Sequence, residues 1–176
     1  MSNRVRQFIR GILAKGPDNK ERQMIDELLE PKARQVFFSM NVADQRHSLN
    51  VLYTALKFAQ NEGEHMDLDF LKRCCLLHDV GRGDKMGCFR KSYAVLLDKF
   101  FHEWAIKIGG SINTNPLNEI MYRYYHHAEI SSDILKNMGM KREANIVLRH
   151  HSGKKADLAA DEMCILEILM MADEIN

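Results

Sequence analysis

An adjacent histidine and aspartate, His78 and Asp79, offer the clearest chemistry in this sequence. They follow the apolar run Cys-Cys-Leu-Leu and precede Val-Gly-Arg, so a buried segment ends here and a glycine-containing turn begins. An imidazole nitrogen and a carboxylate oxygen are suitable ligands for divalent iron, manganese, zinc, cobalt or nickel. Donors at the end of a buried helix, next to a loop, are well placed to hold such an ion. The pair therefore predicts a metal site.

Further donors of the same kind stand elsewhere in the chain. Eight histidines are many for a domain of this length, and several lie at predicted helix ends or beside turns. The candidate ligands, in chain order, are His47, His78, Asp79, His127, His150, His151 and Asp173. A lone histidine on a helix is usually structural or solvated, so the prediction depends on the whole set. A cleft at the ends of packed helices would bring these positions together.

The segments that must position these donors all have the pattern of helices. Apolar residues recur with a period of 3.6 from residue 42 to about 60, with His47 near the start, and again over 67–77, which ends at the His-Asp pair. The other expected helices span 17–29, 31–38, 89–108 (as one or two), 115–126, 129–138, 141–151 and 161–174. No segment has the alternation of a strand. The sequence predicts an all-α domain, a compact bundle of about seven to nine helices with a metal site in its central cleft.

The local contexts of the candidate ligands resemble those of the HD-domain superfamily of metal-dependent phosphohydrolases. Gln-Arg-His47-Ser-Leu-Asn-Val resembles the helix of the family's first histidine, and Leu-Leu-His78-Asp79-Val-Gly-Arg resembles its HDIGK turn. The segment His127-Ala-Glu-Ile-Ser-Ser-Asp-Ile-Leu resembles the HPEIGAEIL segment of the HDIG branch. Together with the His-His and Ala-Asp pairs that follow, five motifs occur in the family's order between residues 42 and 176. The order makes the resemblance specific.

The resemblance implies a role for each candidate ligand. In the family, the first histidine, the His-Asp pair and the last aspartate bind one metal. The corresponding residues here are His47, His78, Asp79 and Asp173. Members with two metals add three histidines, and the aspartate of the pair bridges the ions. The matching residues are His127, His150 and His151. One or two divalent ions are therefore expected, with two favoured, and the alignment favours His127 over its neighbour His126.

Three basic residues are candidates for binding a substrate phosphate. Arg82 occupies the position of the lysine in HDIGK, and Lys85 and Arg46 lie near the motifs. The resemblance implies hydrolysis of a phosphate mono- or diester, most simply a nucleotide, by metal-activated water, with Asp79 and Arg82 as catalytic residues. The alternatives are a di-iron oxygenase that uses the same ligands and a non-catalytic, metal-binding signalling domain.

Differences from named branches of the family argue against the substrates of those branches. His151 is followed by Ser-Gly rather than by Glu and a Gly-Tyr-Pro motif, which argues against cyclic di-GMP phosphodiesterases. The run Val-Gly-Arg-Gly-Asp84 replaces the Glu-Asp of guanosine tetraphosphate hydrolases. Diadenosine tetraphosphate hydrolases keep a single histidine, matching His151, where this chain has two. The chain looks most like the small HDIG-type hydrolases of bacteria.

Composition and charge agree with a single soluble domain. The 176 residues are 45% hydrophobic and 28% charged, and a net charge of +1 predicts no attraction to nucleic acid. No run of about 20 apolar residues predicts a membrane span. Four cysteines without a CxxC pair indicate reduced thiols and a cytoplasmic location. The partner expected is therefore a small phosphorylated substrate.

The first 40 residues lie outside the motifs. We expect residues 1–40 to form a helical extension packed on the core and residues 41–176 to form the HD domain. Residues 5–15 mix arginine with apolar residues at helical spacing, which favours a packed helix over the alternative of an amphipathic helix on a membrane. The extension would serve either as a helical cap or as the contact of a homodimer.

Overall fold

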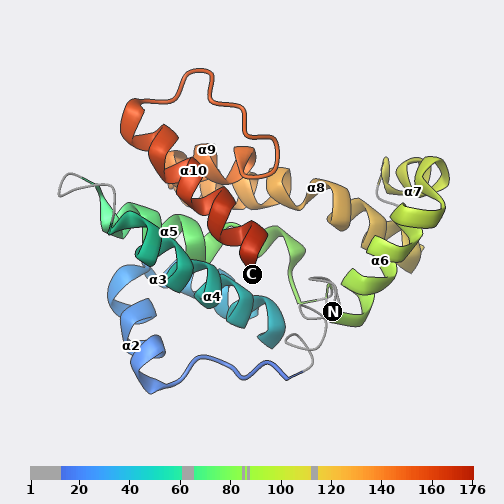
Figure 1. Ribbon diagram of the computed structural model, residues 1–176. Coiled ribbons are helices and arrows are strands. Elements are labelled where there is room, and N and C mark those ends of the chain that lie inside the picture. Colours follow the sequence, from blue (N-terminus) through green and yellow to red (C-terminus); the bar gives the residue numbers. More distant parts are fainter. Residues whose placement is uncertain (1–12, 61–65, 85, 87, 112–114) are drawn as a thin grey trace.

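Helices are the regular secondary structure of the part of the chain that the computed structural model describes, residues 13–60, 66–84, 86, 88–111 and 115–176. Within these ranges there are nine α-helices, one 3-10 turn and no strand, which confirms the predicted all-α class (Figure 1). The helices are α2 (Asn19–Leu28), α3 (Pro31–Ser39), α4 (Val42–Ala59), α5 (Leu68–Leu77), α6 (Cys88–Phe100), α7 (His102–Gly109), α8 (Pro116–Asn137), α9 (Lys141–Arg149) and α10 (Ala160–Ile175), and the 3-10 turn η1 spans Val80–Arg82. None of the described helices is long and apolar enough to cross a bilayer.

Side-chain caps set where α4 and α5 begin. The side chain of Asn41 accepts a hydrogen bond from the backbone nitrogen of Asp44 and starts α4. Asp67 caps α5 in the same way, through the backbone nitrogen of Phe70. Since α5 ends at Leu77, the His-Asp pair follows its last turn.

One large hydrophobic core joins most of the bundle. It includes side chains from α2 to α5 and from α8 to α10, and helix α10 packs on α4, α5 and α9. Ile25 and Phe37, from the predicted extension, are fully buried in this core. Residues 1–12 of that extension lie outside the described residues, and the domain boundary near residue 40 stays a prediction.

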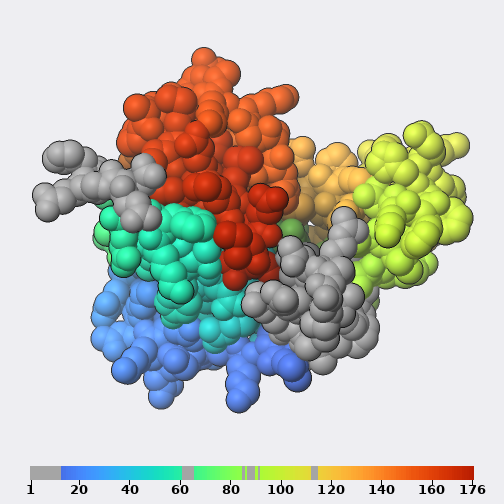
Figure 2. Space-filling view, in the orientation of Figure 1, coloured from blue at the N-terminus to red at the C-terminus, as the bar shows by residue number. Residues whose placement is uncertain are grey.

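A second, smaller core joins α6 and α7 to the first half of α8. Its buried members are Ala94, Ala105 and Met121. Gly109 lets α7 approach α8 closely, since an added Cβ would lie 2.6 Å from a ring carbon of Tyr125. In Figure 2 this pair of helices stands out from one end of the molecule.

The structure differs from the sequence prediction in α8. Two helices, 115–126 and 129–138, were expected, with His127 at their junction, but α8 is continuous over Pro116–Asn137. No glycine or proline interrupts its interior. The turn at Gly81 packs against the middle of this helix, where a Cβ at Gly81 would lie 2.7 Å from the backbone nitrogen of Ser131. His127 is therefore held within a regular helix beside the His-Asp turn.

Helix α2 is tied to α4 by a nearly buried carboxylate. Arg46 donates hydrogen bonds from Nη1 and Nη2 to the two oxygens of Glu21, at 2.7 and 2.9 Å. It also donates to the backbone carbonyls of Lys15 and Gly16. The Tyr53 hydroxyl donates to Glu21 at 3.0 Å. The guanidinium nitrogens of Arg46 thus form their hydrogen bonds with the extension. The predicted contact of Arg46 with a substrate stays a prediction.

This network predicts a pH-dependent stability. The hydrogen bonds from Arg46 lower the pKa of Glu21 from 4.5 to about 2. A depressed carboxyl pKa stabilises the fold above pH 4.5, by about 3 kcal/mol, and this contribution is lost as the pH falls toward 2. We expect Glu21→Gln to lower the melting temperature at pH 7, with the difference from the wild type shrinking at pH 3. Circular dichroism melting curves measure this.

The control for that experiment is Glu27→Gln, because Glu27 is exposed on the same helix. It should leave the melting temperature nearly unchanged at both pH values. If Glu21→Gln and the wild type differed equally at pH 7 and pH 3, the ionised Glu21 would not be the source of the stability.

Candidate metal centre

The structure brings all seven candidate ligands into one place. They come from five separate segments of the bundle. His47 lies on α4, His78 and Asp79 follow α5, His127 lies on α8, His150 and His151 follow α9, and Asp173 lies near the end of α10. Helices distant in sequence thus contribute donors to a common site, as the motif order predicts.

The first group of donors consists of His47, His78 and Asp173, whose ligand atoms all lie within 4.8 Å of one another. Nε2 of His47 lies 2.9 Å from Oδ1 of Asp173. The same oxygen lies 3.6 Å from Nε2 of His78. One carboxylate oxygen and two ring nitrogens therefore surround a single point, which suits one divalent ion.

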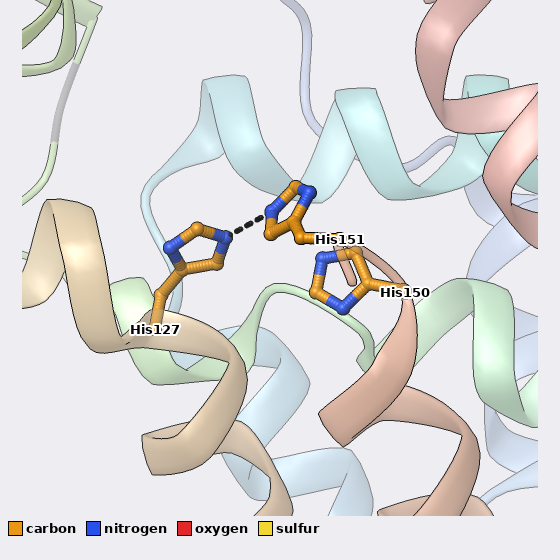
Figure 3. Close-up of side chains that lie close together, drawn as sticks. All are labelled: His127, His150 and His151. Carbon is orange, nitrogen blue, oxygen red and sulfur yellow. Dashed lines mark hydrogen bonds between the residues drawn. The ribbon is translucent and has the colours of Figure 1, made fainter. Parts of the chain in front are cut away.

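The second group consists of His127, His150 and His151, whose ligand atoms also lie within 4.8 Å of one another. Figure 3 shows His127 projecting from α8 toward the two rings that follow α9. Nε2 of His127 lies 2.6 Å from Nε2 of His151, and the ring centroids of His150 and His151 are 3.9 Å apart. This group is composed of nitrogen donors alone.

Asp79 lies between the two groups and presents one oxygen to each. Its Oδ2 is 3.4 Å from Nε2 of His78 and 3.7 Å from Nε2 of His47, in the first group. Its Oδ1 is 3.5 Å from Nε2 of His127, in the second. The side chain is fully buried. A carboxylate in this position is suited to bridge two ions.

Backbone carbonyls orient three of the histidine rings. In each case Nδ1 lies 2.6 to 3.0 Å from the carbonyl oxygen of the residue three positions earlier. The pairs are His78 with Cys75, His127 with Tyr124, and His150 with Val147. A carbonyl only accepts hydrogen bonds, so Nδ1 carries a proton in all three rings. Nε2 then offers a lone pair to an ion whenever the ring has no second proton. These backbone hydrogen bonds thus direct the three Nε2 atoms into the site, from the ends of α5 and α9 and from the middle of α8.

The charges of the site favour cation binding. Burial would raise the pKa of Asp79, but Arg82 and His78 hold it well below its usual value. Burial lowers the pKa of His150 to about 3, with His78 contributing. Burial and Arg82 likewise hold the pKa of His127 well below its usual value. Burial would also lower the pKa of His78, but the carboxylates, Asp79 first, outweigh it and raise that pKa to about 10. The carboxylates thus attract positive charge, while the second group offers neutral nitrogens.

Several of these buried atoms lack a hydrogen-bond partner in the structure. They are Nε2 of His78, Nε2 of His150 and both carboxylate oxygens of Asp79. Buried polar atoms are normally satisfied, and each unsatisfied one costs about 1 to 3 kcal/mol. A divalent ion would satisfy them, and a nitrogen and oxygen donor set suits iron, manganese, cobalt, nickel or zinc. These residues therefore fit a divalent metal.

Arg82 is buried beside Asp79. Its Nη1 lies 2.6 Å from Oδ2 of Asp79. The two atoms form an ion pair, but their angles are not those of a hydrogen bond. Its Nη2 lies 3.4 Å from Nε2 of His127. The structure thus places Arg82 inside the site, as its position in the HDIGK-like turn predicts. Lys85, the other predicted cation on this turn, lies outside the described residues.

His126 points away from the donors that surround its neighbour. Its ring packs on Tyr122, with ring centroids 4.5 Å apart, and Nδ1 lies 3.7 Å from a carboxylate oxygen of Glu129. His127 is buried and faces Asp79. The geometry agrees with the preference for His127 as the candidate ligand.

A groove of about 520 Å³ adjoins the site, and the sequence motifs did not indicate it. It reaches the site at His150, His151 and Asp173. Its other lining residues are Gly153, Lys155, Glu167, Met170, Met171 and Glu174. The one sequence feature near the groove is the Lys-Lys pair shortly after the two histidines. Such a pair is typical of a solvated surface, so it did not predict a binding groove. The groove provides access to the donors from the surface of α10.

A comparison with protein-family models matches residues 45–174 to the HD domain. The match covers most of the chain and includes all seven donors described above. Comparisons with curated proteins and with solved structures gave no match.

Proposed function

This chain belongs to the HD-domain superfamily of metal-dependent phosphohydrolases, and on that premise we propose that it hydrolyses a phosphate mono- or diester, with a nucleotide as the substrate. The observation that carries the proposal is the position of Asp79. Its two oxygens face two separate groups of donors, at 3.4 Å from His78 and 3.5 Å from His127. This arrangement supports a centre of two ions, of iron, manganese, cobalt, nickel or zinc.

The chemistry follows from the residues that would hold the ions and the phosphate. A divalent ion supplies a water of lowered pKa at neutral pH and neutralises phosphate oxygens. Asp79 accepts a hydrogen bond from the attacking water and orients it toward phosphorus. Arg82 donates to a phosphate oxygen and stabilises the charge that develops there. The water oxygen forms a new bond to phosphorus while the bond between phosphorus and the ester oxygen breaks. A proton lost by the water ends on the leaving ester oxygen.

The groove supports a substrate that is larger than a phosphate group. Its volume of about 520 Å³ lies within the usual range of small-molecule sites. Met170 and Met171 offer thioether side chains on which an aromatic base can pack. Lys155 lies in the same groove, paired with Glu167. A nucleotide meets these features with its base on the methionines and its phosphate at the donors.

The proposal includes a cytoplasmic location, where cysteines without a disulfide are usual. Cys74 and Cys75 are buried and free, and burial raises the pKa of both thiols, so neither is suited to bind a metal.

The proposal is tested by screening the purified protein against nucleotide mono- and diesters. The protein is loaded with manganese and kept free of oxygen, and product formation is followed by chromatography. We expect hydrolysis of at least one nucleotide, loss of activity with a chelator, and recovery when manganese is added back. Turnover that requires oxygen would instead support a di-iron oxygenase. Absence of turnover from a fully metal-loaded protein over the whole panel would contradict the proposal.

A further inference from the structure

The two helices α6 and α7, residues 88–109, carry large apolar side chains that face solvent. We call this part the α6–α7 lobe. Its exposed apolar residues are Tyr93, Leu96, Phe100, Phe101, Trp104 and Ile106. Phe100, Phe101 and Trp104 are 64%, 61% and 49% exposed. An ordinary surface exposes large apolar residues singly, whereas six of them lie in this lobe. Figure 2 shows that this part of the molecule protrudes.

The exposed apolar residues lie outside the small core that joins the lobe to α8. The lobe is attached through its opposite side, where Ala94, Ala105 and Met121 form its small core with α8. Polar contacts strengthen the attachment, since the Tyr125 hydroxyl donates a hydrogen bond to Asp98. On the outer side, Tyr93, Leu96 and Phe100 follow the spacing i, i+3 and i+7 of a single helix face. This face has the pattern of a buried surface, yet it is exposed.

Positive charge is concentrated in the same segment. Residues 88–109 contain four basic residues against two acidic ones, an excess of two, while the whole chain has an excess of one. Lys99 and Lys107 are exposed among the apolar side chains. Nζ of Lys99 lies 5.5 Å from the ring centroid of Phe100. One of the two acidic residues, Asp98, is engaged by Tyr125 and by His102. The surface is therefore both aromatic and basic.

From these observations we propose that the α6–α7 lobe binds the surface of an anionic lipid bilayer. Aromatic side chains favour the boundary between headgroups and acyl chains, and lysines beside them attract anionic headgroups. The lobe projects from the body (Figure 2), so its apolar residues can reach a flat, deformable surface. The proposed contact is peripheral, because it is made by side chains on the outer face of the lobe. The binding holds the metal centre near a membrane surface.

The chain contains a single tryptophan, Trp104, and it lies on the proposed contact surface. Its fluorescence therefore reports on this surface alone. The full-length protein is mixed with vesicles of phosphatidylcholine, with or without phosphatidylserine, and binding is measured by flotation. With phosphatidylserine we expect flotation, a blue shift of the emission of Trp104, and quenching of that emission by brominated acyl chains. Phosphatidylcholine alone should bind much less.

Two variants test which residues make the contact. Replacing Phe100 and Phe101 by serine should weaken binding roughly tenfold for each residue. Replacing Lys99 and Lys107 by glutamine should weaken binding to phosphatidylserine vesicles about fivefold for each lysine. The matched control is Leu68→Ser, because Leu68 is 44% exposed at the start of α5. This control should bind as the wild type does. Circular dichroism confirms that each variant is folded.

Three outcomes would overturn the proposal. The first is that the wild-type protein neither floats nor shows quenching of Trp104 with phosphatidylserine vesicles, a result that needs no variant. The second is that Leu68→Ser weakens binding as much as the phenylalanine substitutions do. The third is a lipid-independent blue shift that grows with protein concentration and is lost in the phenylalanine variant, because the occupant would then be a second copy of the chain. Loss of hydrolysis would leave the proposal unaffected, since lipid binding is measured without a substrate.

Discussion

Replacing Asp79 by asparagine should abolish hydrolysis and lower the content of bound metal, while the fold is retained. Asparagine keeps the shape of the side chain and removes its charge. Both donor groups then lose their shared anionic oxygen, since Oδ2 faces His78 and Oδ1 faces His127. We expect kcat to fall roughly a thousandfold or more, because water orientation and charge neutralisation are lost together. Metal analysis after dialysis and steady-state kinetics measure the two effects.

The matched control is Glu143→Gln, which neutralises another buried carboxylate that is paired with an arginine. Oε1 of Glu143 accepts a hydrogen bond from Nε of Arg73 at 2.7 Å, near the start of α9 and away from the donors. This variant should keep its metal and its kcat, even if its melting temperature falls. If Asp79→Asn kept its full metal content, Asp79 would not be a ligand and the assignment of the bridge would be wrong.

Replacing His127 by glutamine should reduce the metal stoichiometry from two ions toward one. His127 supplies one of the three nitrogens of the second group and lies outside the first group. We therefore expect the affinity of the second ion to fall roughly tenfold to a hundredfold, while the first ion is retained. Calorimetric titration of the protein with manganese measures both binding steps.

The neighbouring residue provides the control for this experiment. His126→Gln makes the same chemical change one position earlier, on a side chain that packs on Tyr122. This variant should bind metal as the wild type does. An unchanged stoichiometry in His127→Gln would support a site with a single metal, and equal losses in the two variants would point to damage to α8 rather than to a lost ligand.

The helical class and the order of the donors could be predicted because both depend on local features. Caps such as Asn41 and Asp67 and the apolar period of 3.6 define helices from short stretches of sequence. The His-Asp pair stands at the end of such a helix and just before a glycine, so the sequence predicts its position beside a turn. The continuity of α8 was missed because histidines and tyrosines at its centre resemble a junction when they are viewed without their neighbours.

Other properties depended on contacts between distant segments. His47 and Asp173 are 126 residues apart in sequence, yet their donor atoms lie 2.9 Å apart. Arg46 stands next to a donor in sequence, but its guanidinium turns toward Glu21 in the extension. The exposure of a helix face also depends on contacts between distant segments. The apolar face of the α6–α7 lobe has the spacing of a buried helix face, and only the folded structure shows that no other described segment covers it.

Helix periodicity, capping and the order of motifs are properties of the chain, so an all-α HD domain with donors for a metal could be predicted before any contact was known. Three features became visible only in the folded bundle: which oxygen of Asp79 faces which group, how two adjacent histidines point in different directions, and which apolar face remains uncovered. A side chain's direction and exposure are set by the surfaces packed against it, and those surfaces come from segments far away along the chain.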